Sequence, residues 1–339
     1  MIRPTRRTIV TGAAAATFAG FGLPLRHAKA AEFTFKVATD QPDAHPLNIH
    51  LRKAAELVAR DTNGRMELKI FSNNVLGGQA DVFTQLRQGA VEVFLLSGVN
   101  VLSQLIPGTA LHGLGFAFKD YDQVWAAMDG EVGAHLRGLI EKGGLVVLDK
   151  VWDNGFRQIT NSVKPITQPS DLRGMKIRVP ISALWTSLFQ SLGASPTSLN
   201  FAEVYSALQT KVVDGQENPP AIIDAAKLFE VQKYCSVTNH MWDGWWFLIN
   251  RRVWGGVPAD IKDIVAKHMN TQVMEQRKDV ARVNGSLRDE LSKRGLIFND
   301  VDQAPFKEEL RKSGFYTEWR KKFGDEAIGK LEKVTGPLG

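Results

Sequence analysis

The fold is decided by three β-prone runs near the start of the chain: FTFKVA at residues 33–38, MELKI at 66–70 and VEVFLL at 91–96. Segments with the apolar spacing of a helix lie between them, at 47–61 and 79–88. The order strand, helix, strand, helix, strand predicts parallel pairing, because parallel strands need a crossover connection and such crossovers are right-handed. We therefore expect an α/β fold that opens with a parallel sheet.

A second α/β unit is expected over residues 155–243. Its clearest strand is MKIRV at 175–179, and helices are expected at 182–192 and 201–210. Farther on, the composition of the chain is rich in Lys, Glu, Leu and Arg, which predicts long helices near the C-terminus.

Two short stretches contain residues that interrupt regular structure. The Asp-Asn-Gly of 153–155 is typical of a turn, and we interpret it as the point where the chain crosses between two domains. The segment 214–220 contains Gly215 and two prolines and is expected to be irregular. The long C-terminal helices are expected at 258–294 and 304–334.

Length and composition limit the class of protein. A chain of 339 residues suggests two domains, and 44% hydrophobic residues exclude global disorder. Its one cysteine, Cys235, excludes an internal disulfide framework and is expected to be a buried, small apolar residue. The net charge of +6 would fit a polyanionic partner if the basic residues were spread over the folded protein.

The basic excess lies instead at the N-terminus. Residues 1–30 hold five of the 42 basic residues and none of the 36 acidic ones, so the remainder carries 37 basic against 36 acidic residues. A basic start with Arg6 and Arg7, an uncharged middle and Ala-Lys-Ala at 28–30 predict a twin-arginine export signal, cleaved after Ala30. We therefore expect a periplasmic protein without a nucleic-acid partner. An uncleaved anchor helix is disfavoured by the Gly, Pro and Thr content of the stretch.

Motifs for catalysis and for cofactor binding are missing from the sequence. It has no G-x-G-x-x-G after the first strand, no Walker loop, no G-x-S-x-G elbow and no H-E-x-x-H. Cys235 and His240 could be imagined as a nucleophile and its base, but a cysteine beside an aromatic-rich strand is usually part of the core. We expect a binding protein that is not an enzyme and uses no metal or cofactor.

Three polar residues are candidates for ligand contacts. Arg178 ends its strand, where ligands of open α/β sheets bind, and its planar fork matches a carboxylate. A surface ion pair is the alternative for Arg178, and Arg157 leaves the same two choices open. Asn218 could bind a carboxylate and a hydroxyl with its amide, or could belong to an Asx turn.

Tryptophans are concentrated in the part of the chain that contains Arg157, Arg178 and Asn218. Five of the eight tryptophans lie between residues 152 and 246. Most of them could be core, as is expected for Trp185 on a helix. A site lined by one or two of them, with Trp152 and Trp242 as candidates, would favour a ligand with an apolar or aromatic body.

A family resemblance is carried by several motifs that occur in order. They are NGFR at 154–157 with TNS at 160–162, DLRGMKIRVP at 171–180, GASP at 193–196, FAEVYSALQ at 201–209 and VDGQENP at 213–219. With these motifs the chain closely resembles the substrate-binding proteins of tripartite ATP-independent periplasmic (TRAP) transporters, over roughly residues 33–330.

The resemblance implies an α/β periplasmic binding protein fold, with two domains, an interdomain cleft, hinge strands and long C-terminal helices. The expected bounds are 31–154 plus 244–283 for domain I and 155–243 plus 284–339 for domain II. Such proteins close on a small organic acid and deliver it to a membrane permease with a small and a large subunit, driven by an ion gradient.

The resemblance also implies roles for particular residues. The position of Arg178 makes the main carboxylate salt bridge in the family, and Arg157 and Asn218 assist it. Phe201 matches a residue that packs over the ligand, and His240 lies in a segment that often lines the cleft. Two further positions match ligand contacts from the first domain, Asp40 and Ser97. Asp40 is an acid that could repel an anion or bind a hydroxyl or ammonium group.

Two other functions remain compatible with the sequence. A periplasmic sensor subunit would use the same cleft but pass its closed state to a signalling receptor. An enzyme on the same fold would need a nucleophile with its base, or a metal cluster, in the cleft.

Overall fold

The computed structural model describes residues 30–339. The expected export signal at 1–30 therefore lies outside the described residues, except for Ala30. None of the helices in the described part of the chain combines the length and hydropathy needed to span a membrane.

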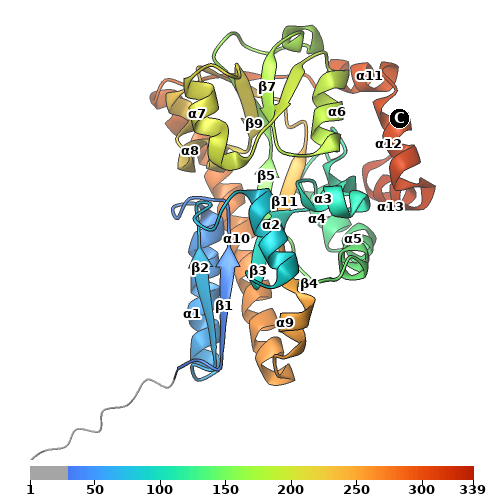
Figure 1. Ribbon diagram of the computed structural model, residues 1–339. Coiled ribbons are helices and arrows are strands. Elements are labelled where there is room, and N and C mark those ends of the chain that lie inside the picture. The colour runs from blue at the N-terminus through green and yellow to red at the C-terminus, as the bar shows by residue number, and fades with distance from the viewer. Residues whose placement is uncertain (1–29) are drawn as a thin grey trace, which may run out of the picture. The chain divides into compact units, whose positions relative to one another are not determined.

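The first sheet has six strands, and its order is β2-β1-β3-β11-β4, with β5 also paired to β11 (Figure 1). β1 pairs in parallel with β2 and β3, as predicted from the opening of the sequence, and β11 pairs antiparallel to its neighbours. The strands are β1 (Phe33–Ala38), β2 (Met66–Phe71), β3 (Val93–Ser97), β4 (Leu145–Val147), β5 (Trp152–Phe156) and β11 (Trp242–Asn250).

Helices connect the strands of the first sheet, and their ends follow from local chemistry. Pro46 opens α1 (Pro46–Asp61), whose N-cap His45 accepts a hydrogen bond from the backbone N–H of Leu47 through Nδ1. α2 (Gln79–Gln88) ends at Gly89, which has the left-handed conformation common after helices. The other helices here are α3 (Leu102–Leu105), the 3₁₀ helix η1 (Pro107–Gly113), α4 (Tyr121–Met128), α5 (Glu131–Lys142) and α9 (Arg251–Gly255).

The second sheet also has six strands, in the order β12-β10-β6-β9-β7-β8. They are β6 (Gln158–Asn161), β7 (Lys176–Val179), β8 (Ser195–Ser198), β9 (Gly215–Asn218), β10 (Tyr234–Val237) and β12 (Ile297–Asp300). The connecting helices are η2 (Pro169–Leu172), α6 (Ala183–Ser191), η3 (Phe201–Glu203), α7 (Val204–Gln209), α8 (Pro220–Ala225) and η4 (Leu228–Glu230).

The expectation of irregular structure at 214–220 is wrong, because Gly215–Asn218 forms β9, a fully buried inner strand of the second sheet. Glycine is required here, since a Cβ on Gly215 would lie 2.3 Å from the carbonyl oxygen of Thr160 on the neighbouring strand. Pro219 and Pro220 do not disturb the strand, because they follow it and begin α8.

The turn expected at 153–155 is also absent, because these residues lie inside β5. Gly155 has φ of +115°, a conformation that glycine tolerates and other residues rarely adopt. The register between β5 and β11 shifts between Asp243 and Gly244 of β11, which pair with Gly155 and Asp153 of β5. The turn-like composition therefore marks an irregular antiparallel pair of the first sheet, at the point where β5 leads through Arg157 into β6 of the second sheet.

The long helix α10 (Ala259–Lys293) contacts α1 and β5 of the first sheet's part and α8 and β12 of the second (Figure 1). The chain then forms α11 (Ala304–Lys312), α12 (Phe315–Phe323) and α13 (Asp325–Thr335) instead of one helix over 304–334. The breaks coincide with Gly314 and Gly324, both at positive φ. α11 and α12 contact α6, whereas α13 contacts α4 and α5, so these helices join both parts.

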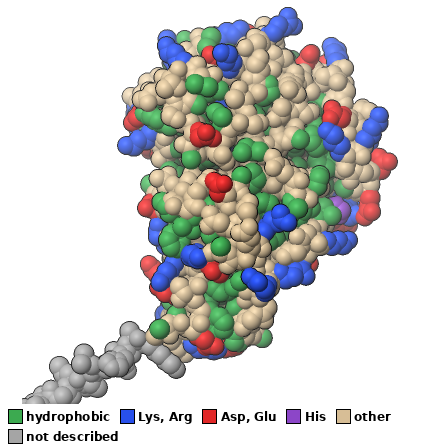
Figure 2. Space-filling model, in the orientation of Figure 1, with side chains coloured by type: hydrophobic (Ala, Val, Ile, Leu, Met, Phe, Trp, Pro, Cys, Tyr) green, Lys and Arg blue, Asp and Glu red, His purple; other side chains and the backbone are tan. Residues whose placement is uncertain are grey.

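The hydrophobic core also continues from one part to the other. A single cluster of buried side chains includes Phe94 of the first sheet, Ile177 of the second and Phe315 of the C-terminal helices. β11 is buried on both faces: Trp246 belongs to this cluster and Trp245 to another, beneath α1 and α10. On the face shown in Figure 2, basic and acidic side chains are interspersed.

Candidate functional site

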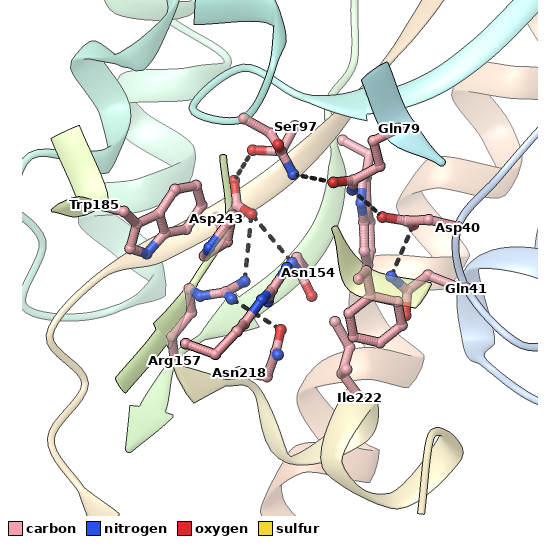
Figure 3. A pocket seen from close by; sticks show the side chains of 15 residues that line it. Asp40, Gln41, Gln79, Ser97, Asn154, Arg157, Trp185, Asn218, Ile222 and Asp243 are labelled. Atoms are coloured by element: carbon pink, nitrogen blue, oxygen red, sulfur yellow. Dashed lines mark hydrogen bonds and ion pairs between the residues drawn. The ribbon is translucent and has the colours of Figure 1, made fainter. Parts of the chain in front are cut away.

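A small cavity, with a volume of about 20 Å³, lies between the two sheets (Figure 3). From the first sheet and its loops it is lined by Asp40, Gln41, Gln79, Ser97, Asn100, Asn154, Asp243 and Trp245. From the second sheet and its loops it is lined by Arg157, Arg178, Pro180, Trp185, Phe201, Asn218 and Ile222. The lining is therefore mainly polar, with aromatic rings at its sides.

Arg178, on β7, is a buried charged residue of this cavity. Its side chain is 1% exposed, and its Nε and Nη2 donate to the carbonyl oxygen of Leu199 at 3.1 and 2.7 Å. Within residues 30–339, its guanidinium forms no salt bridge, and its Nη1 makes no hydrogen bond. Burial lowers the pKa of Arg178 to about 9, which still leaves the group charged at neutral pH. A buried cation without a counterion favours an anion in the cavity.

Arg157, in contrast, has its counterion within the protein. Its Nε and Nη2 donate to the two carboxylate oxygens of Glu217, at 2.5 and 2.8 Å, and its guanidinium lies over the ring of Trp185. Burial would raise the pKa of Glu217, but Arg157 and His240 outweigh it and lower that pKa to about 2. Nη2 of Arg157 also donates to Oδ1 of Asn218 at 2.9 Å. Arg157 therefore orients Asn218 at the cavity wall.

Asp243, on β11, joins the polar groups of the opposite wall. Its Oδ1 accepts from the hydroxyl of Ser97 at 2.6 Å, and its Oδ2 accepts from the amide of Asn154 at 3.2 Å. Nη1 of Arg157 lies 3.5 Å from Oδ2 of Asp243. This carboxylate therefore connects residues of both sheets around one side of the cavity.

Asp40 lies in a separate chain of amides. Its Oδ1 accepts from Gln41 at 2.8 Å, its Oδ2 accepts from Gln79, and Gln79 in turn accepts from the amide of Asn100 at 2.9 Å. Burial is the main cause that raises the pKa of Asp40, and these hydrogen bonds oppose it. Asp40 is thus an acceptor group held in place at the cavity.

Several buried polar atoms of the lining have no hydrogen-bond partner among the described residues. They are Oε1 of Gln41, Oδ1 of Asn154 and Nε1 of Trp185. Buried polar atoms in proteins nearly always have partners, so unpaired atoms at a cavity indicate a site for a polar molecule. No group of three or more metal-ligating side chains occurs in residues 30–339.

Comparison with known proteins identifies the family. The model of the family described as "Bacterial extracellular solute-binding protein, family 7" matches residues 37–319. The chain belongs to this family. This family 7 protein is 32% identical over 277 residues to the 2,3-diketo-L-gulonate-binding periplasmic protein YiaO of Escherichia coli, with 81% of this chain and 83% of YiaO covered.

Two further similarities agree with this assignment. A TRAP periplasmic solute-binding protein from Sulfurospirillum deleyianum, solved with bound succinate, has a TM-score of 0.85 and 31% identity, covering 90% of this chain and 99% of that chain. The uncharacterized protein y4mM of Sinorhizobium fredii is 36% identical over 262 residues, which is 77% of this chain but 48% of y4mM. The family 7 protein is thus of the TRAP type, a class of transport receptors, and the predicted α/β binding-protein fold is confirmed.

The cavity of this family 7 protein brings together six of the nine residues that the sequence singled out. They are Asp40, Ser97, Arg157, Arg178, Phe201 and Asn218. They come from separate strands and loops of both sheets.

The other three residues lie outside the cavity lining. Side chains alternate along β11, so Trp242 faces away from the cavity that Asp243 and Trp245 line, and its Nε1 donates to Asp153 at 2.9 Å. Trp152 is fully buried in an apolar cluster. His240 lies behind Glu217, with Nε2 at 3.0 Å from a carboxylate oxygen, and so supports the residue that holds Arg157.

Sequence reasoning missed several lining residues, among them Trp185, Asp243 and Trp245. Trp185 belongs to the buried core, as expected for its place on a helix, and it also lines the cavity, where the guanidinium of Arg157 lies over its ring. The alternation of β11 could have placed Asp243 and Trp245 together on one face. Cys235 is fully buried, as predicted, and Nε2 of His240 is directed at Glu217.

Proposed function

We propose that this protein captures a small hydroxylated carboxylate in the periplasm and delivers it to a TRAP permease in the membrane. The observation that carries the proposal is the buried guanidinium of Arg178, which has no acidic partner in residues 30–339 and lines a polar cavity. A carboxylate would neutralise this charge and accept hydrogen bonds from it.

The geometry around Arg178 supports a carboxylate in particular. The carbonyl oxygen of Leu199 holds Nε and Nη2, which fixes the plane of the guanidinium and leaves Nη1 available. Nε1 of Trp185 is a second donor without a partner in the described chain. Asn218 lines the same cavity, and its Nδ2 donates to Oε1 of Gln216 at 2.6 Å, which leaves one amide hydrogen of Nδ2 for a ligand. These donors can surround one carboxylate group.

The remaining lining supports hydroxyl groups on the ligand. Asp40 is a buried acceptor, and the amide oxygens of Gln41 and Asn154 have no partner within residues 30–339. Hydroxyl groups donate to such acceptors, whereas an aromatic body would leave them unpaired. Trp185, Trp245 and Phe201 can pack against the C–H faces of a hydroxylated chain. The polar lining therefore favours a sugar acid over the aromatic ligand considered from the tryptophan content.

Two relatives are associated with acids of different kinds, one with several hydroxyl groups and one without. YiaO is named for 2,3-diketo-L-gulonate, and the Sulfurospirillum protein was solved with succinate. Both molecules carry the carboxylate that Arg178 would bind, but only the first also carries several hydroxyl groups. We assign this protein to the first kind of ligand because its cavity offers acceptors as well as donors.

A thermal-shift panel tests this proposal. The panel contains D-gluconate, 2,3-diketo-L-gulonate, succinate and phenylpyruvate, with D-glucose as a matched control that lacks the carboxylate. We expect the sugar acids to stabilise the protein most, by about 2.7 kcal/mol at a hundredfold excess over Kd, and D-glucose to have no effect. Stabilisation by phenylpyruvate alone would contradict the hydroxylated ligand, and a panel without any response would contradict carboxylate capture.

Export and delivery need their own measurements. We propose that the twin-arginine signal is cleaved after Ala30, so N-terminal sequencing of the exported protein should begin at Ala31. Deleting the gene should abolish uptake of the stabilising acid if the protein serves a permease. A sensor subunit would instead leave uptake unchanged and abolish the transcriptional response to the acid.

A further inference from the structure

A chain of buried hydrogen bonds runs from Asn218 at the cavity into the second sheet. Nδ2 of Asn218 donates to Oε1 of Gln216 at 2.6 Å, and Nε2 of Gln216 donates to the hydroxyl of Thr160 at 2.8 Å. That hydroxyl donates in turn to Oε1 of Gln232 at 2.9 Å. Gln216 on β9 pairs with Thr160 on β6, and both side chains are fully buried. Asn218 lines the cavity, whereas the other three residues lie behind it.

The direction of this chain is fixed by the groups at its two ends. A guanidinium can only donate, so the amide oxygen of Asn218 faces Arg157, whose Nη2 donates to it at 2.9 Å. At the other end, Nε2 of Gln232 donates to a backbone carbonyl oxygen at 2.9 Å, so its amide oxygen faces Thr160. Both ends therefore require the same orientation of Gln216, with its oxygen toward Asn218 and its nitrogen toward Thr160.

This orientation decides what Asn218 offers to a ligand. Its Oδ1 is turned toward Arg157, and one of the two hydrogens on Nδ2 is bonded to Gln216. The second hydrogen on Nδ2 is left for a ligand, so Asn218 acts as a donor at the cavity. Arg157, Glu217 and the buried chain all belong to strands of the second sheet or the residue next to them, so this arrangement does not depend on contacts with the first sheet.

We propose that Gln216 and Thr160 are positioning residues that fix the amide of Asn218 as a donor to the bound acid. The ligand atom that meets Asn218 is then an acceptor, such as a carboxylate or keto oxygen, and not an ammonium group. An amide that is turned over would present its oxygen to the carboxylate and lose that hydrogen bond. The positioning rests on the proposed function, because it matters for binding only if the ligand is an acid.

Thr160→Val removes the hydroxyl at nearly constant volume, so Gln216 loses the acceptor that sets its direction. We expect the Kd for D-gluconate, or for succinate if only diacids stabilise the protein, to rise about three- to tenfold, the range for one hydrogen bond. Thr160→Ser keeps the hydroxyl and should bind as the wild type does. Thr210→Val, at an exposed threonine, is the matched control. A wild-type Kd in Thr160→Val, or an equal loss in Thr160→Ser, would overturn the proposal.

A double-mutant cycle tests whether Gln216 acts through Asn218. Gln216→Leu should weaken binding of the acid in the wild-type background but cause no further loss in Asn218→Ala, because the amide that it positions is already missing. Titration calorimetry measures the four values of Kd. The same loss in both backgrounds would mean that Gln216 supports the fold alone, and would contradict the positioning role.

A ligand-free test uses nuclear magnetic resonance of the ¹⁵N-labelled protein. The side-chain amide of Asn218, identified by its loss in Asn218→Ala, should exchange hydrogen with solvent slowly in the wild type and in Thr160→Ser. It should lose this protection in Thr160→Val. If the wild type binds no acid but the amide behaves as expected, the proposed function fails and the buried chain stands. If Thr160→Val leaves the exchange unchanged, the positioning role fails.

Discussion

Two buried arginines at the cavity differ in what neutralises them. Arg157 has Glu217 at 2.5 Å and Asp243 at 3.5 Å, whereas Arg178 has a backbone carbonyl oxygen as its acceptor. Sequence reasoning could not distinguish the two, because either arginine could have been a surface residue. The difference arises from Glu217, which reaches Arg157 from the neighbouring strand of the second sheet.

Replacing Arg178 should remove most of the affinity for an acid. We expect Arg178→Ala to weaken binding at least tenfold, about 1.4 kcal/mol, because the carboxylate would be buried without its cation. Arg178→Lys should also weaken binding, since a point charge cannot replace the planar fork. Titration calorimetry measures both. Arg173→Ala, at an exposed arginine a few residues before β7, should bind normally. An unchanged Kd in Arg178→Ala would rule out its role.

Asp153 should make stability depend on pH. Burial raises its pKa to about 7, although a hydrogen bond from Trp242 opposes the rise. The folded state then binds more protons than the unfolded state, so the wild type should lose stability as the pH rises from about 4 to about 7. A rise of this size in the pKa corresponds to a loss on the order of 4 kcal/mol.

Asp153→Asn isolates this contribution, because the amide oxygen can still accept from Trp242. Urea unfolding at pH 4.5 and pH 7.5 should show the variant gaining on the wild type as the pH increases. Parallel pH profiles of the two proteins would contradict the assignment.

At the scale of elements, the paired strands β5 and β11 have an irregular register and an unusual backbone conformation at Gly155. Gly155 combines φ of +115° with a tight fit, since a Cβ there would lie 2.7 Å from Nδ2 of Asn284 on α10. The irregular register with Asp243 on β11 lies at the same place, beside Asn154 of the cavity. The irregular pair therefore positions site residues, and β5 leads directly into the second sheet.

Gly155→Ala should destabilise the protein by about 1–3 kcal/mol, through the strained backbone and the contact with Asn284. Gly138→Ala is the matched control, because it lies inside α5 and its new Cβ would meet no atom within 4 Å. That variant should be neutral or up to about 1 kcal/mol more stable. Thermal unfolding of both tests the prediction, and equal melting temperatures would contradict it.

At the scale of the whole described molecule, the cavity is too small for a ligand as it stands. Its volume of about 20 Å³ compares with roughly 300–1,000 Å³ for typical small-molecule sites. The lining comes from both sheets, so room for an acid requires the two parts to separate. We propose that they do so along the domain bounds expected from the sequence, with the C-terminal helices, which contact both parts, limiting the motion.

Small-angle scattering should detect this motion. In solution we expect the protein to have a larger radius of gyration without an acid than with a stabilising one, because a bound carboxylate favours closure. D-glucose serves as the control and should leave the scattering unchanged. The same radius in both states would contradict domain closure.

The sequence by itself determined the elements that local patterns specify. The parallel start of the first sheet, α1, α2, β7 and α10 follow from apolar periodicity and from caps, which act within a few residues. The motifs around Arg157, Arg178 and Asn218 also determined the family and these three polar residues of the site. These patterns are local in the chain, so they can be recognised without knowledge of the packing.

Only the tertiary structure decided what depends on neighbours far apart in sequence. β9 is a strand because β6 and β7 flank it, and its glycine permits their approach even though its composition favours a loop. Trp242 and Trp185 belong to the same core cluster, but only Trp185 also lines the cavity, because of strand alternation and helix docking, which tryptophan content cannot reveal. Within residues 30–339, Arg178 has no acidic partner because Glu217 pairs with Arg157 instead, and strand pairing in the folded protein decides this.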